Sequence, residues 1–248
     1  MDAYTSFAQV YDLFMDNVPY GEWSAYLSAY LAAHGITEGT LLELGCGTGR
    51  MTRLMAARGY DVIGVDNSVD MLSIAASAGT DSRISYVMQD MQALELDGPV
   101  RAVYSACDCI NYVLGEEELL SVFERVRRYL EPGGLFLFDL NTPYKYRELL
   151  SDNTFAENRS EGSFIWENYF DEAEGINEYD LTLFIPDGHG LYQRFEEVHC
   201  QRCYEIEQVV RMLEESGFAL LGTYDAYTDE PLRGDSERAM FAAKPDRY

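Results

Sequence analysis

Residues 43–50 read E-L-G-C-G-T-G-R and follow a short apolar run. Gly45, Gly47 and Gly49 alternate with other residues, so the backbone either turns tightly here or lies close to a ligand or a neighbouring helix. A glycine-rich turn leading into a helix is a natural binding site for polar ligand groups. The dinucleotide fingerprint G-x-G-x-x-G does not fit, because the third glycine comes one residue early. A phosphate-binding P-loop does not fit either, because no G-K-[ST] sequence is present.

The chain around this loop alternates between expected strands and expected helices. Continuous apolar runs predict buried strands at residues 41–46, 61–66, 84–90, 100–107 and 135–140. Helical spacing predicts helices at residues 48–58, 67–78 and 116–130, the last of them ended by Pro132-Gly133-Gly134. This order predicts an α/β fold with βαβ units, right-handed crossovers and a mostly parallel sheet covered on both faces. Helices are also expected over residues 7–33, with a break at residues 19–21.

The pattern changes after residue 150. Aromatic-rich runs at residues 164–170, 179–185 and 191–200 predict three antiparallel strands, with hairpin turns at residues 171–175 and 186–190. A helix at residues 205–216 and strands at 218–224 and 239–243 then return to the main sheet, which gives it seven strands. We therefore predict one main domain, residues 1–145 and 201–248, with an antiparallel β insertion after the fifth strand at residues 146–200.

The amino-acid composition indicates which classes of partner the protein can bind and in which cellular compartment it is expected. The 248-residue chain carries a formal charge of −25, with 43 acids against 18 Lys plus Arg, and Lys145 and Lys244 are its two lysines. Nucleic acid is a disfavoured partner because phosphate binding needs clustered cations. No membrane-spanning run and no signal sequence is recognisable, so the cytoplasm is the expected location. The five cysteines are expected to be free thiols, and we predict no metal site even though His199 precedes Cys200-x-x-Cys203.

The motifs in this order resemble those of the class I S-adenosylmethionine-dependent methyltransferases. The match includes the glycine loop, an acid at the end of the second strand, Gln89-Asp90-Met91 after the third, Cys107-Asp108-Cys109 after the fourth, and the Pro-Gly-Gly turn before the fifth. The resemblance implies a Rossmann-like fold with S-adenosylmethionine as the cofactor. The amino-terminal helices and the insertion resemble small-molecule N-methyltransferases of the glycine and amino-sugar dimethyltransferase kind, and their bacterial relatives.

The resemblance also implies a set of cofactor-binding residues. Asp66 would accept hydrogen bonds from both ribose hydroxyls, Asp90 and Met91 would hold the adenine, and Met71 would pack against it. The methionine end would be held by Glu43 and by the backbone of Gly45 and Gly47, close to Cys107. Tyr11, Tyr20 and Trp23 would form an aromatic lid that offers the sulfonium a cation–π face, although ordinary helix packing explains these three aromatics equally well.

The methyl acceptor is the open question. Candidate catalytic residues are Asp108 and Tyr112 after the fourth strand, and His199 in the insertion, which could act as a general base near neutral pH. His199 and Arg202 would face opposite sides of a regular strand, so at most one of them can point at the pocket. The motif D-C-I-N-Y is not the [DN]-P-P-[YF] of enzymes that methylate base amines. We expect methyl transfer to N or O of a small molecule. The alternatives are an RNA or protein methyltransferase and a non-catalytic cofactor-binding protein, and the insertion could pair two copies in a homodimer.

Overall fold

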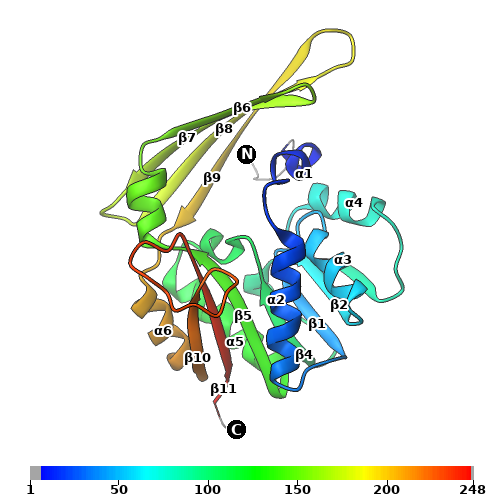
Figure 1. Ribbon diagram of the computed structural model, residues 1–248, viewed down its shortest axis with the longest axis vertical. Coiled ribbons are helices and arrows are strands. Elements are labelled where there is room, and N and C mark those ends of the chain that lie inside the picture. Colours follow the sequence, from blue (N-terminus) through cyan, green and yellow to red (C-terminus); the bar gives the residue numbers. More distant parts are fainter. Residues whose placement is uncertain (1–6, 247–248) are drawn as a thin grey trace.

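The computed structural model describes residues 7–246 of the chain, which form two sheets with flanking helices (Figure 1). The main sheet has seven strands in the order β10-β11-β5-β4-β1-β2-β3. Its strands are β1 (Thr40–Leu44), β2 (Asp61–Asp66), β3 (Ile84–Met88), β4 (Val100–Ser105), β5 (Leu130–Asn141), β10 (Phe218–Asp225) and β11 (Arg238–Pro245). The pairs from β3 to β5 are parallel, whereas β11 is antiparallel to both β5 and β10. The predicted mostly parallel seven-stranded sheet is confirmed.

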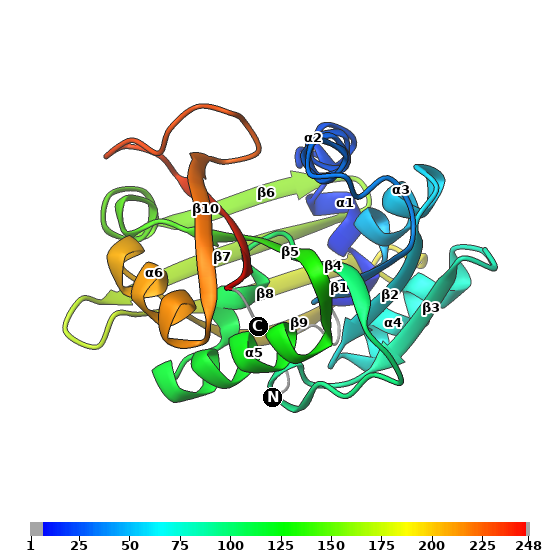
Figure 2. The same cartoon turned by 90° about the horizontal axis from the view of Figure 1, so that it is seen from below.

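Helices cover both faces of the main sheet (Figure 2). They are α2 (Tyr20–Ala33), α3 (Arg50–Ala57), α4 (Val69–Ser77), α5 (Glu116–Tyr129) and α6 (Ile206–Glu215). Neighbouring strand residues contribute to opposite cores: Leu42 packs with α5 and α6, whereas Leu41 packs with α2 and α3. This alternation explains why the strands read as continuous apolar runs, since both faces are buried.

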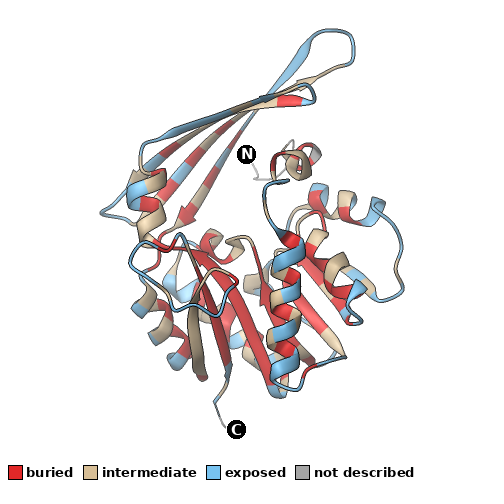
Figure 3. Ribbon diagram, in the orientation of Figure 1, coloured by how far each residue is buried: buried red, intermediate tan, exposed pale blue. Residues whose placement is uncertain are grey.

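A second sheet of four antiparallel strands, β6-β7-β8-β9, lies over one end of the main sheet (Figures 1 and 3). Its strands are β6 (Thr154–Arg159), β7 (Gly162–Asp171), β8 (Ile176–Pro186) and β9 (Tyr192–Arg202), and the π-helical turn η4 (Lys145–Leu150) leads into them. The three strands predicted from sequence correspond to β7, β8 and β9. The prediction missed β6, and β9 continues to Arg202.

The amino-terminal segment lies beneath the inner face of the second sheet. It contains the short helices η1 (Phe7–Gln9) and α1 (Tyr11–Phe14). Val10 and Phe14 are buried against Leu181 and Leu183 of β8. The helices predicted over residues 7–33 are therefore divided in two. The short helices η1 and α1 pack on the second sheet, whereas the long helix α2 packs on the main sheet.

Two local predictions from sequence are displaced in position. The amino-terminal helices are broken as predicted, but the break lies at residues 15–19 and not at 19–21, because α2 begins at Tyr20 and contains Gly21; Pro19 precedes its first turn, where a proline costs no hydrogen bond. Pro132-Gly133-Gly134 was expected to end α5, but α5 ends at Tyr129. Leu130 already pairs with Val100 of β4, so this turn lies within β5. No helix in the described residues is long and apolar enough to cross a membrane.

Candidate functional site

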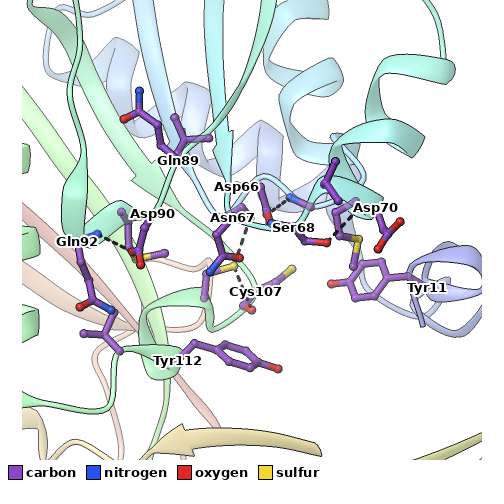
Figure 4. A pocket seen from close by; sticks show the side chains of 18 residues that line it. Tyr11, Asp66, Asn67, Ser68, Asp70, Gln89, Asp90, Gln92, Cys107 and Tyr112 are labelled. Atoms are coloured by element: carbon purple, nitrogen blue, oxygen red, sulfur yellow. Dashed lines mark hydrogen bonds between the residues drawn. The ribbon is translucent and has the colours of Figure 1, made fainter. Parts of the chain in front are cut away.

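A cavity of about 520 Å³ opens at the carboxyl ends of the first four parallel strands. Ligands bind in this position in open α/β sheets, because loops after neighbouring strands leave a crevice there. The volume is within the range of small-molecule sites. Its walls come from the loops after β1, β2, β3 and β4 and from the amino-terminal segment (Figure 4). The residues that line it are Tyr11, Gly45, Gly47, Val65, Asp66, Asn67, Ser68, Val69, Asp70, Met71, Gln89, Asp90, Met91, Gln92, Cys107, Cys109, Tyr112 and Val113.

The glycine loop forms the floor of the cavity, and two of its glycines are required by geometry. Gly45 has φ +70°, and a Cβ there would lie 2.6 Å from Sγ of Cys109. Gly47 has φ +52° and donates its backbone N–H to Oδ2 of Asp66 over 2.7 Å. The loop therefore turns back on the end of β2, which leaves open space above Gly47.

Asp66 is held rigidly at the end of β2. Its other carboxylate oxygen accepts from the backbone N–H of Ser68 over 2.9 Å, and Ser68 caps α4 by accepting from the N–H of Met71. Burial raises the pKa of Asp66, although the backbone N–H groups of Ser68 and Gly47 oppose the shift. A carboxylate oxygen has two lone-pair sites, so each can still accept from a ligand hydroxyl.

Asp90 occupies the matching position after β3. Its Oδ1 accepts from the backbone N–H of Gln92 over 2.8 Å and caps the short helix η2 (Met91–Ala93). Met71 and Met91 add apolar side chains to the lining of the cavity. A cavity with one acid at each of two strand ends, apolar side chains in its lining and a glycine loop beside them fits a nucleoside with a polar tail.

The turn after β4 carries backbone strain. Cys107 and Asp108 both have positive φ, +63° and +52°. Their N–H groups donate to the fully buried carboxylate of Asp139, and Arg238 pairs with Asp139 at 2.9 Å and with Asp108 at 2.7 Å. These contacts stabilise a conformation that non-glycine residues rarely adopt. Burial opposes the charge on Asp108, but Arg238, Lys145 and Gln201 outweigh it and lower the pKa of this carboxyl.

Tyr112 connects the cavity to the second sheet. It ends the short helix η3 (Cys109–Tyr112), and its ring extends beneath Cys107 toward the side on which Tyr11 lies (Figure 4). Its hydroxyl lies 3.2 Å from Nδ1 of His199, which is buried on the inner face of β9. Arg202 lies on the other face of β9 and pairs with Glu116, as the strand alternation predicts.

Nine of the predicted site residues line the cavity, and five do not. The nine are Tyr11, Gly45, Gly47, Asp66, Met71, Asp90, Met91, Cys107 and Tyr112. Glu43 is buried below the loop, where it accepts from the hydroxyls of Thr52 and Tyr104. Trp23 stacks on Tyr227 with ring centroids 4.3 Å apart. Tyr20 packs behind the cavity under Arg50, whereas Asp108 and His199 lie on its second-sheet side.

Sequence reasoning missed several buried polar residues. Asp139 lies within the apolar run L-F-L-F-D-L, where an acid in a buried strand is itself a signal. Glu197 shares the inward face of β9 with His199 and Gln201, at the two-residue spacing of a strand. Arg238 offered no comparable signal, because it begins a strand whose pairing with β5 is a long-range contact.

Fold and cavity together define a Rossmann-like α/β domain with a small-molecule site at the carboxyl ends of its parallel strands. Residues 41–134 match the family described as a methyltransferase domain. A putative methyltransferase of Bacillus subtilis (strain 168) is 34% identical over 98% of both chains. A solved S-adenosylmethionine-dependent methyltransferase from Clostridium acetobutylicum superposes with a TM-score of 0.88 at 28% identity, over 99% of this chain and 100% of that one.

The chain belongs to the family of S-adenosylmethionine-dependent methyltransferases, and its cofactor is S-adenosylmethionine. A more distant relative from Streptomyces venezuelae, 23% identical over 96% of this chain and 97% of its own, is named dTDP-3-amino-3,4,6-trideoxy-alpha-D-glucopyranose N,N-dimethyltransferase. The predicted class of enzyme and the predicted cofactor are both confirmed.

Proposed function

We propose that this methyltransferase acts on an amine nitrogen of a small molecule, which enters between the cofactor cavity and the inner face of the second sheet. One observation carries the proposal: Tyr112 lines the cavity and its hydroxyl lies 3.2 Å from Nδ1 of the buried His199. The amino-sugar dimethyltransferase named above supports nitrogen as the acceptor atom. On this proposal residues 1–145 and 201–248 bind the cofactor, and the insertion at residues 146–200 forms the acceptor side.

The cavity residues take roles that follow from their chemistry. The Asp66 carboxylate accepts from the ribose diol, because two acceptor oxygens match two neighbouring hydroxyls. Asp90 accepts from the adenine amino group, while Met71 and Met91 pack on its ring. The backbone at Gly45 and Gly47 and the ring of Tyr11 border the methionine end.

Bound S-adenosylmethionine supplies a methyl group activated by a positive sulfur, so the chain itself mainly positions the acceptor and excludes water. An amine attacks only through a free lone pair, and at neutral pH most alkyl amines carry a proton. Tyr112 and His199 provide an acceptor for that proton. Asp108 does not face the cavity. It pairs with Arg238 and accepts from Gln201 Nε2 over 2.8 Å, which gives it a positioning role at the end of β4.

Methylation of a small amine, of a phenol or of RNA can be told apart by the substrates that the enzyme accepts. A strongly acidic chain with two lysines is a poor match for RNA, and this favours the small amine. The test is a panel of amines, amino sugars, phenols and bulk RNA incubated with the cofactor, followed by mass spectrometry for an added methyl group. Methyl transfer to RNA without transfer to any amine would overturn the proposal. Methyl transfer to phenols alone would show that the acceptor atom is oxygen and not nitrogen.

Asp66→Ala tests the cofactor site directly. We expect the dissociation constant for S-adenosylmethionine to rise at least about tenfold, since a charge-assisted hydrogen bond contributes about 1.5–3 kcal/mol. Titration calorimetry measures it. Asp61→Ala is the matched control, because this acid is exposed at the opposite end of the same strand. Equal affinities of the two variants for the cofactor would refute the ribose assignment.

A further inference from the structure

Glu197 is a buried acid that no part of the methyl transfer described above uses. It lies on the inner face of β9, and 2% of its surface is exposed. Burying a carboxylate is costly unless it is paired, so its partners indicate why it is present. Its two oxygens reach two different parts of the molecule. Oε1 accepts from the backbone N–H of Phe7 over 2.8 Å, and Oε2 lies 3.3 Å from Nε2 of His199.

The contact with His199 extends into a chain that reaches the cofactor cavity. A carboxylate beside Nε2 favours the tautomer in which that nitrogen carries the proton. Nδ1 then keeps a lone pair, and the hydroxyl of Tyr112 lies 3.2 Å from it. The order carboxylate, imidazole and hydroxyl is the arrangement by which a base is oriented and its charged form stabilised.

The contact with Phe7 connects the same carboxylate to the amino-terminal segment. The Phe7 ring packs edge-on against His199, with centroids 6.5 Å apart, and against Tyr11, with centroids 5.3 Å apart. Tyr11 lines the cofactor cavity. The segment that borders the cavity is therefore anchored on the acid that contacts the histidine.

We propose that Glu197 is a positioning residue that holds His199 in its proton-accepting tautomer and makes this state depend on docking of the amino-terminal segment over the cavity. The inference rests on the proposed function. Before transfer, a proton of the acceptor ammonium passes to the Tyr112 oxygen while the Tyr112 proton passes to Nδ1 of His199, which becomes an imidazolium. The freed nitrogen lone pair would then form the bond to the methyl carbon, and the electron pair of the broken C–S bond would stay on sulfur.

Glu197 is an acid placed to balance an imidazolium at His199. Among the described residues 7–246, the other titratable groups near the ring are Tyr112 from η3, Tyr179 opposite it on β8 and, beyond the Phe7 ring, Tyr11 from α1. Burial raises the pKa of Tyr179 and of Tyr11 well above the usual range, so both stay neutral during turnover. The 3.3 Å separation between Nε2 and Oε2 is an ion-pair contact and does not meet hydrogen-bond geometry in this structure. Catalytic contacts of this kind commonly shorten and align in the reacting complex.

Glu197→Gln in the full chain tests the inference, with Glu196→Gln as the matched control. Glu196 is the neighbouring residue on the exposed face of β9, where it pairs with Arg194. The sequence has three histidines, so ¹⁵N spectra of labelled protein report His199 after assignment by its loss in His199→Gln. We expect a protonated Nε2 in the wild type and in Glu196→Gln, and a mixture of tautomers in Glu197→Gln. Amide exchange across residues 7–14 should be at least about tenfold faster in Glu197→Gln alone.

Enzyme kinetics then test whether the contact between Glu197 and His199 matters for methyl transfer. With an amine acceptor, we expect Glu197→Gln to lower kcat about ten- to hundredfold with little change in the KM of the cofactor, and to cause no further loss in a His199→Gln background. An unchanged tautomer together with unchanged amide exchange overturns the inference. The inference is also overturned if the double variant loses kcat by the product of the two single-variant factors, because the two residues then act independently. If no amine is methylated by the wild type, the proposed function fails while the spectra and exchange still decide the role of Glu197. If Glu197→Gln does not fold, Glu197→Asp keeps the charge one methylene shorter and should give intermediate exchange.

Discussion

At the scale of single residues, the most unusual group is Glu43 below the glycine loop. Burial raises its pKa to about 8, although the hydroxyls of Thr52 and Tyr104 donate to the carboxylate and oppose the shift. The loop above it carries Gly45 and Gly47, so its charge state concerns the cofactor site even though Glu43 does not line the cavity. A neutral Glu43 can accept both hydroxyls and still be buried without a charge.

This pKa makes folding stability depend on pH in a defined direction. The unfolded chain ionises Glu43 near its ordinary value of 4.5, whereas the folded chain does so near 8. Its contribution is fully present below pH 4.5, declines as pH rises toward 8 and is absent above, with a slope of at most about 1.4 kcal/mol per pH unit. Glu43→Gln should therefore lose less stability than the wild type between pH 5.5 and 7.5. Urea unfolding at both values measures this, and parallel curves for the two proteins would contradict the prediction.

At the scale of elements, an apolar contact with β8 contributes to docking of the amino-terminal segment, in addition to the Phe7–Glu197 hydrogen bond. Leu183 of β8 is fully buried against Val10 and Phe14. Removing a buried leucine side chain typically costs about 2–5 kcal/mol. Much of that contact joins two elements that no backbone ladder connects, so the loss should act on their docking more than on the main sheet.

We therefore predict that Leu183→Ala loosens the amino-terminal segment and weakens binding of the cofactor. Amide exchange over residues 7–18 should accelerate, and the cofactor dissociation constant should rise several-fold because Tyr11 borders the cavity. Val198→Ala is the control, since that side chain is 48% exposed on β9 and should change stability by less than about 0.5 kcal/mol. Exchange confined to β8, with the segment unaffected, would argue that the segment is held elsewhere.

The elements differ in how well sequence predicts them, for physical reasons. The inner strands of the main sheet, such as β1, β4 and β5, are buried on both faces, so each appears as an apolar run with turn residues at its ends. Strand β6, by contrast, reads T-F-A-E-N-R and is mostly exposed, so neither alternation nor an apolar run marks it. The acids at the ends of β2 and β3 were identified because their places after such runs match the motifs of the methyltransferase family that the sequence resembles. Glu197 was overlooked because its partner Phe7 lies 190 residues away in sequence.

At the scale of the whole molecule, one buried charge cluster joins the two sheets. Arg238 of β11 pairs with Asp139 of β5 and with Asp108 after β4. Asp108 in turn accepts from Gln201 of β9, which also accepts from the hydroxyls of Tyr146 and Tyr179. The main sheet, the turn after β4 and the second sheet therefore share one hydrogen-bonded network. Such long-range pairing was beyond the reach of sequence reasoning, which treated Asp108 as a catalytic candidate.

Arg238→Met should be the most destabilising of these substitutions, because it removes the guanidinium that pairs with the fully buried Asp139 and the partly buried Asp108. Breaking a buried ion pair from one side typically costs about 3–5 kcal/mol. The wild type gains stability from the lowered pKa of Asp108 above its ordinary value of 3.8 and loses that gain as pH falls. The variant should respond in the opposite way, since acid neutralises the stranded carboxylates. Its deficit against the wild type, measured by urea unfolding, should shrink from pH 7 to pH 5. Arg194→Met, which removes an exposed pair with Glu196, should cost less than about 1 kcal/mol at both values. A deficit for Arg238→Met that is independent of pH would mean that lost packing on Trp23, 5.2 Å from the guanidinium, outweighs the charge.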